Sequence, residues 1–176
     1  MRYAQIRDMD ITNGEGIGVA LFVQGCHFRC RNCFNSSTWD FSGGQEFTDE
    51  IKERLLSLLD KPYVSRLSIL GGEPLADENI KDVISIMREA KGVDIWLYTG
   101  YTYDKCLSDP QRKQAVQLAT YVIDGQYVDE LKDLTLKYRG SSNQTIRMTN
   151  ETNRMTNETN RMTNETNRRT NETNGS

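Results

Sequence analysis

Three cysteines within eight residues are the side chains best placed to do chemistry. Cys26, Cys30 and Cys33 occur in the run CHFRCRNCF with the spacing C-x3-C-x2-C. The apolar run VALFVQ comes just before them and predicts a buried strand that leads into the cysteine loop. Three thiolates so placed can bind three irons of a cubane iron–sulfur cluster and leave the fourth iron open to another ligand.

Zinc is the alternative, because structural zinc sites use four Cys or His ligands at similarly short spacings. The fourth ligand would have to be His27, which is adjacent to Cys26, or Cys106, which lies in a distant segment. A lone cysteine such as Cys106 is more simply a small buried apolar residue. A zinc-stabilised adaptor without catalysis therefore stays open beside the cluster.

A second candidate site is the segment Gly71-Gly72-Glu73-Pro74. It follows the next expected strand, at residues 66–70. The two glycines permit close approach of the backbone, and the Glu73 carboxylate and nearby carbonyls can accept hydrogen bonds from a ligand ammonium group. A Gly-Gly-x-Pro sequence alone is usually only a turn. Its place after a strand, behind the cysteine loop, makes it a candidate for ligand binding.

The elements that must position these residues alternate between strand and helix. Apolar runs predict strands, and 3.6-residue periodicity with capping residues such as Thr48 predicts helices. The alternation implies parallel strands with right-handed crossovers, and hence an α/β fold. Thr99, at the end of the third strand, lies where such folds present ligand groups, although a strand-end hydroxyl that bonds its own backbone is an equal alternative. The expected strands are 19–24, 66–70, 94–99 and 121–124, and the expected helices are 48–60, 77–90 and 112–118.

The C-terminal segment is a seven-residue repeat, RMTNETN, that begins at Arg147. Each unit offers at most one apolar side chain, whereas a coiled-coil seam needs two. Because the repeats can bury so little apolar surface, we expect residues 147–176 to be a disordered or weakly structured tail. Residues 1–146 are then a single domain.

Composition excludes several classes of partner. The 176 residues carry a formal net charge of −3, so no basic field favours nucleic acid. No run approaches the roughly 20 apolar residues that span a bilayer, and the N-terminus lacks an apolar run of signal-peptide length. We expect a cytoplasmic protein with neither a nucleic acid nor a membrane as its partner.

The cysteine spacing and the GGEP segment together resemble the radical S-adenosylmethionine superfamily. That superfamily usually has an aromatic residue before the third cysteine, where this chain has Asn32, with Phe34 one place after Cys33. A closer resemblance, over most of residues 1–146, is to the activating proteins of anaerobic ribonucleoside-triphosphate reductase. It is carried by the blocks NGEGIGVALFVQGC, CFNSSTW, LGGEPL, LYTGYTY, VIDGQYVDELKD and RGSSNQ.

The resemblance implies a partial (β/α) barrel of the radical S-adenosylmethionine type. It implies a [4Fe-4S] cluster on Cys26, Cys30 and Cys33, with S-adenosylmethionine on the open iron. The Gly71–Gly72 backbone and Glu73 would orient the cofactor's amino group, and the backbone around Asn32 to Phe34 would meet its adenine. The cofactor-binding candidates are Asn32, Cys33, Phe34, Gly71, Gly72, Glu73 and Thr99.

The resemblance also implies a reaction. One electron from the reduced cluster would cleave S-adenosylmethionine to methionine and a 5′-deoxyadenosyl radical, which would take a hydrogen atom from a glycine of the reductase. An electron donor such as a flavodoxin is implied as a second partner. A different glycyl-radical protein, or a small molecule, is the alternative substrate.

The first prediction concerns the thiolates. Replacing Cys26, Cys30 or Cys33 singly with Ala should abolish a competent cluster, because water is a poor substitute for a thiolate ligand to iron. Iron analysis of the anaerobically purified variants measures the loss. Cys106→Ser is the control and should keep the cluster; an equal loss of iron in that variant would contradict the three-cysteine assignment.

Overall fold

The computed structural model describes residues 1–149 and 151–174 as one mixed α/β domain built on a seven-stranded sheet. The strand order is β3-β1-β2-β4-β5-β6-β7. The strands are β1 (Arg2–Asp10), β2 (Gly18–Val23), β3 (Gln45–Glu46), β4 (Arg66–Gly71), β5 (Asp94–Thr99), β6 (Tyr121–Asp124) and β7 (Thr145–Met148). The helices are α1 (Asp49–Leu59), α2 (Ile80–Glu89), α3 (Tyr103–Leu107), α4 (Pro110–Leu118) and α5 (Glu151–Asn174), with 3-10 turns η1 (Ser36–Thr38) and η2 (Asp129–Leu131).

The centre of the sheet consists of four parallel strands, β2, β4, β5 and β6, as the sequence predicts. Their ends are in register, since Val23 pairs with Gly71 and Thr99 pairs with Asp124. The loops that follow these strands therefore meet at one edge of the sheet. Antiparallel strands complete both sides, with β1 beside β2 and β7 beside β6.

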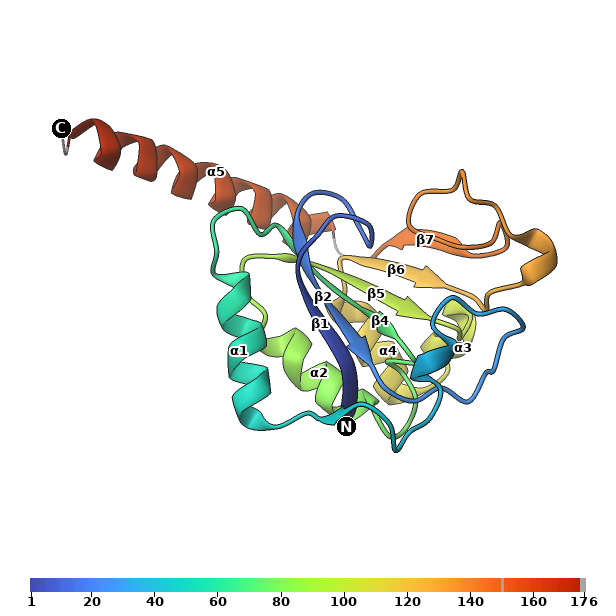
Figure 1. The fold of residues 1–176 in the computed structure, drawn as a ribbon. Coiled ribbons are helices and arrows are strands. Elements are labelled where there is room, and N and C mark those ends of the chain that lie inside the picture. Colours follow the sequence, from blue (N-terminus) through green and yellow to red (C-terminus); the bar gives the residue numbers. More distant parts are fainter. Residues whose placement is uncertain (150, 175–176) are drawn as a thin grey trace.

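Helices α1, α2 and α4 cover one face of the sheet (Figure 1). Alternate residues of the parallel strands point to that face and form the main apolar core with the helices, for example Leu21, Ile69 and Leu97. The other strand residues, such as Phe22 and Leu70, face away from the helices. The uncovered face is thus left for loops and for a cavity.

Side-chain hydrogen bonds determine where helices α1 and α2 begin. Thr48 caps α1, as expected, by accepting a hydrogen bond from the amide of Ile51. Helix α2 begins at Ile80 rather than near residue 77. The preceding Asn79 does not cap the helix, because its side-chain amide donates instead to the carbonyls of Gln24 and Glu73.

Strands β1 and β7 are not predicted by the sequence analysis. Both carry many polar residues and lie outside the parallel centre, so neither is a continuous apolar run. Strand β7 crosses the expected domain boundary at residue 146, and the Thr149 hydroxyl donates to the carbonyl of Ala119 beyond it. The ordered domain therefore includes the first residues of the repeat segment.

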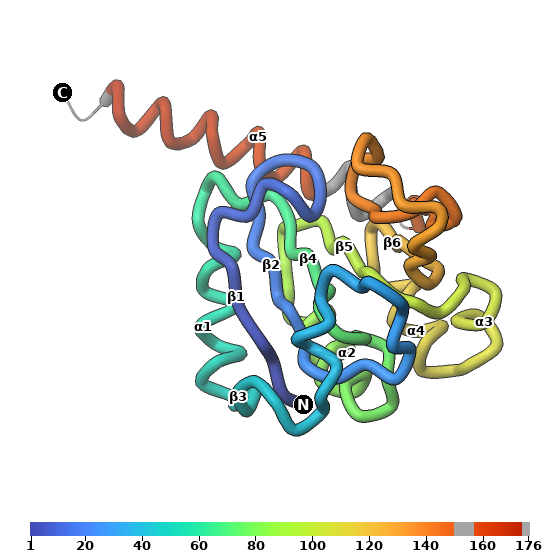
Figure 2. Tube along the Cα trace, turned by 45° about the vertical axis from the view of Figure 1, so that its right-hand side comes forward, coloured from blue at the N-terminus to red at the C-terminus, as the bar shows by residue number. Residues whose placement is uncertain are grey.

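The repeats form helix α5, which extends away from the body of the domain (Figures 1 and 2), and this differs from the expected weakly structured tail. Threonine hydroxyls of this helix donate to carbonyls four residues earlier, as Thr163 does to Thr159. Near the middle of α5, Arg161 donates to the carbonyl of Ser65 and lies 3.8 Å from the carboxylate of Asp94. Among the described residues, no helix combines the length and apolarity needed to cross a membrane.

The second prediction concerns how much β7 and α5 each contribute to the stability of the domain. A chain ending at Thr149 should keep its stability within about 1 kcal/mol, because the contacts described for α5, those of Asn157 and Arg161 with the domain, are polar. A chain ending at Gln144 loses the β6–β7 ladder and should melt about 5 °C lower or more. Thermal unfolding followed by circular dichroism compares the two with the full chain. Equal melting temperatures for the two truncated chains would show that β7 does not stabilise the domain.

Candidate functional site

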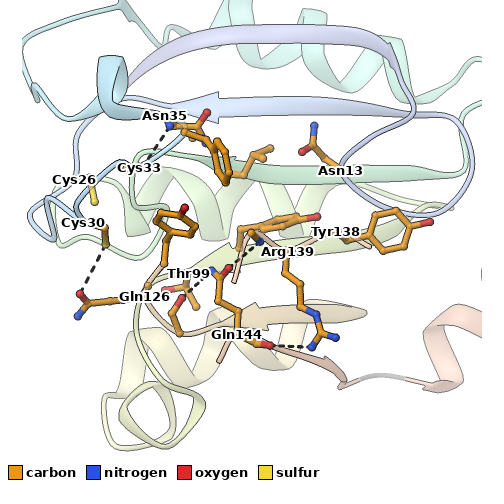
Figure 3. A pocket seen from close by; sticks show the side chains of 18 of the residues that line it. Asn13, Cys26, Cys30, Cys33, Asn35, Thr99, Gln126, Tyr138, Arg139 and Gln144 are labelled. Atoms are coloured by element: carbon orange, nitrogen blue, oxygen red, sulfur yellow. Dashed lines mark hydrogen bonds between the residues drawn. The ribbon is translucent and has the colours of Figure 1, made fainter. Parts of the chain in front are cut away.

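A cavity of about 490 Å³ lies over the uncovered face of the sheet, at the ends of the parallel strands (Figure 3). Its lining contains residues that the sequence places far apart in the chain. The structure brings together most of the predicted site: Cys26, Cys30, Cys33, Phe34, Gly71, Gly72 and Thr99 all line this cavity.

Backbone hydrogen bonds fix the cysteine loop that follows β2. The amide of Cys26 donates to the carbonyl of Trp39 at 3.1 Å, and the amide of Cys33 donates to the carbonyl of Cys30 at 3.1 Å. Arg29 and Asn32 have positive φ angles of 49° and 55°. These left-handed residues turn the chain back on itself, so that the three thiols return to the same cavity.

Burial sets the chemistry of the thiols. It raises the pKa of Cys26 to about 11, and the charge of Glu73 adds to the effect. Burial also raises the pKa of Cys30, with the neighbouring Cys33 thiolate as a further cause. Metal binding requires deprotonated thiols, so positive charge from bound iron has to offset this cost. Iron that binds Cys26 and Cys30 therefore has to displace their protons.

The two side chains that could supply a fourth ligand to a single zinc ion are engaged in other contacts. No three His, Cys, Asp or Glu side chains in residues 1–149 and 151–174, so far as these are described, gather around one metal position. Cubane ligands lie farther apart, because each thiolate binds a different iron. His27 is exposed and pairs with Glu78 at 2.8 Å, while Cys106 packs in the apolar core, as expected of a lone cysteine.

The two glycines of the GGEP segment allow it to touch the start of the cysteine loop. The amide of Gly72 donates to the carbonyl of Val23, and the amide of Glu73 donates to the carbonyl of Gly25 at 2.8 Å. A Cβ atom on Gly72 would lie only 2.4 Å from the Gly25 oxygen. Gly71 has a φ of 103°, a conformation that side chains disfavour. Both positions require glycine for backbone packing.

Glu73 is buried beneath the cavity, and its side chain is not among the lining groups. Its carboxylate accepts hydrogen bonds from the Thr99 hydroxyl at 2.7 Å, the Gly100 amide at 2.7 Å and the Leu75 amide at 2.9 Å. Burial raises the pKa of Glu73 to about 7, although these three donors oppose the shift. The carboxylate therefore ties the end of β4 to the end of β5.

The other candidates have separate environments. Phe34 is 59% exposed at the cavity rim, where its ring contacts Tyr127 at a centroid distance of 5.2 Å. Asn32 lies outside the cavity lining and donates from its side chain to Asp129 at 2.8 Å. Asn32 thus fastens the cysteine loop to η2, and its side chain is not presented to the cavity.

The sequence analysis did not predict several residues that line the cavity on the side of the segment before β7. Gln144 holds this segment in place: its side chain accepts hydrogen bonds from the amides of Gly140 and Ser141 and donates to the carbonyl of Gly125 at 3.1 Å. The available signal was that these residues fall in the NGEG, LYTGYTY, VIDGQY and RGSSNQ blocks or close to them. The missed lining residues include Asn13, Tyr98, Gln126, Tyr127, Tyr138, Arg139 and Gln144.

Comparison with known proteins decides between the possible uses of this cavity. A family model described as a 4Fe-4S single cluster domain matches residues 12–147, which contain all three loop cysteines. Anaerobic ribonucleoside-triphosphate reductase-activating proteins of Salmonella typhi and Escherichia coli (strain K12) are 39% and 38% identical over 152 residues, spanning 83% of this chain and 97% of theirs. The protein of that name from Enterobacteria phage T4 is 36% identical over 150 residues, 83% of this chain and 93% of its own.

The chain belongs to the anaerobic ribonucleoside-triphosphate reductase-activating protein family. A [4Fe-4S] cluster is thus its metal group, and the zinc adaptor is set aside. In this reductase-activating chain, the donor set fits the cluster. Three soft thiols face one cavity, and glycine backbone packs behind them, so three irons can be bound while one stays open toward the cavity.

The third prediction tests the glycine contact. Gly72→Ala should lose most of its bound iron, because a Cβ atom would push the Gly25 oxygen and displace the cysteine loop, at a cost of about 1–3 kcal/mol. Gly92→Ala is the matched control: its φ is 73°, but no atom lies within 4 Å of the added Cβ. It should cost about 1–2 kcal/mol and keep its iron. Full iron content in Gly72→Ala would show that the loop tolerates the displacement.

Proposed function

We propose that this chain is a glycyl-radical activase that acts on an anaerobic ribonucleoside-triphosphate reductase. The observation that carries the proposal is the single cavity that joins three loop cysteines to the GGEP glycines, in a chain of the reductase-activating family. The chain is accordingly a radical S-adenosylmethionine oxidoreductase.

We propose that Cys26, Cys30 and Cys33 bind three irons of the cluster, and that S-adenosylmethionine occupies the cavity beside the fourth. When bound, the reduced cluster would supply one electron to the sulfonium of S-adenosylmethionine, which would release methionine and a 5′-deoxyadenosyl radical able to take a hydrogen atom from a glycine. The chain's own contribution is to place the cofactor, limit water and orient the protein substrate.

The cofactor's contacts are assigned to backbone and small side chains. We propose that the carbonyls of Gly71 and Gly72 accept from its amino group, with Thr99 in the same cavity lining. We propose that the backbone around Asn32 to Phe34 meets the adenine. Glu73 acts through Thr99 and Gly100, which its carboxylate holds by hydrogen bonds, and is therefore a positioning residue.

The fold of the proposed enzyme is a partial (β/α) barrel. Four parallel strands with helices on one face, and a ligand cavity at the strand ends, support this architecture. We propose a one-electron donor such as a flavodoxin as the reducing partner. Cys30 is only partly buried, so such a donor can approach the cluster loop closely.

The fourth prediction concerns the product. With dithionite and S-adenosylmethionine, the anaerobic protein should form a glycyl radical on the cognate reductase, because the open cavity needs a docked substrate to enclose it. Electron paramagnetic resonance should show the radical's doublet. The doublet should vanish when the reductase glycine is replaced by alanine.

The controls separate the alternative substrates. Production of 5′-deoxyadenosine without a doublet, in a protein with full iron content, would remove the reductase as substrate and favour another glycyl-radical protein or a small molecule. An unreduced sample should give neither 5′-deoxyadenosine nor the doublet, since cleavage requires the electron.

A further inference from the structure

The cavity continues along the sheet, away from the cysteines, into a region that the proposed cofactor contacts do not use. Its walls include Asn13, Tyr98, Tyr138 and Arg139, which we call the far subsite. Figure 3 shows the labelled cysteines toward one end of the cavity and Asn13 and Tyr138 toward the other. The same cavity can therefore hold a second ligand beside the cofactor.

Two polar groups in the far subsite lack partners. Within the described residues, the buried side-chain atoms without a hydrogen bond are the hydroxyl oxygen of Tyr98 and Nε of Arg139. Leaving a buried polar group unpaired costs about 1–3 kcal/mol. Burial raises the pKa of Tyr98, so its hydroxyl keeps the proton that it can donate. Two unused donors in one cavity indicate a ligand that brings acceptors.

Both donors are held in place by the protein itself. Tyr98 lies on strand β5, and Arg139 donates from Nη1 to the carbonyl of Gln144 at 2.9 Å, which leaves Nε available. The adjacent Tyr138 packs edge-on against Trp96 with ring centroids 5.0 Å apart. The subsite is therefore rigid before a ligand enters, which lowers the entropy cost of binding.

Charged side chains near the far subsite are already engaged within the protein. Arg7, which also lines the cavity, shares the carboxylate of Asp10 with the buried Arg66, at 3.3 Å and 2.9 Å. Arg139 donates from Nη1 to the carbonyl of Gln144. The groups left without partners are one hydroxyl and one N–H, and a peptide carbonyl supplies the acceptor that each of them needs.

The cavity entrance is suited to a polypeptide. Phe34 and Leu134 line the cavity and are 59% and 80% exposed. Exposed apolar side chains at the rim of a polar cavity are typical of protein contact sites. We propose that Tyr98 and Arg139 bind backbone carbonyl oxygens of the substrate protein's glycine-bearing segment, an inference that rests on the proposed function.

Conservative variants test the far subsite. Tyr98→Phe and Arg139→Lys, in the full chain with its cluster, should each raise the reductase concentration needed for half-maximal glycyl radical by about tenfold. The dissociation constant for S-adenosylmethionine, measured by equilibrium dialysis, and 5′-deoxyadenosine formation without reductase should both be unchanged. Tyr63→Phe and Arg54→Lys are matched controls outside the cavity and should change none of these quantities.

The measurements distinguish a failure of the far-subsite hypothesis from a failure of the proposed activase function. Weaker S-adenosylmethionine binding in Tyr98→Phe would assign the hydroxyl to the cofactor and overturn the inference, as would an unchanged requirement for reductase in both variants. A wild-type protein that forms no glycyl radical would overturn the proposed function itself. Tyr98→Phe removes one oxygen and keeps the packed ring, so the test stands even if Arg139→Lys fails to fold.

Discussion

The site depends on one buried residue that joins three strand ends. The backbone amide of Glu73 binds the carbonyl of Gly25, where the cysteine loop leaves β2, while its carboxylate binds Thr99 and Gly100 at the end of β5. The strands are in register, so these connections are short. The cysteine loop, the GGEP segment and the third strand end are thereby held as one rigid unit.

The Glu73 carboxylate is buried under the cavity, where it holds the ends of β4 and β5 together at an energetic cost. A buried carboxylate is disfavoured unless donors surround it, and the raised pKa of Glu73 reflects that cost. Three donors offset it, two of them backbone amides whose positions the fold already fixes. At the cysteine end, the cavity lining therefore presents the Gly71–Gly72 backbone and the thiols, and the Glu73 carboxylate stays beneath it.

The sequence predicts what is locally encoded and misses what is assembled from distant segments. The four parallel strands are visible because burial on both faces requires continuous apolar runs. The cysteines and glycines are visible because one short loop carries each set. Strands β1 and β7 are half-exposed and leave no such run. The far subsite joins Asn13, Tyr98, Tyr138 and Arg139 from three separate segments of the chain, and no spacing in the sequence reveals that they meet.

The repeat helix meets the domain at the opposite ends of the strands from the cysteines. Arg161 and Asn157 contact Ser65 and Asp94, which precede β4 and begin β5. Gain or loss of whole seven-residue units beyond these contacts would change the helix length by about 10 Å each. Such a change would alter how far the C-terminus reaches, and it would leave the contacts with Ser65 and Asp94 and the cysteine end of the sheet in place.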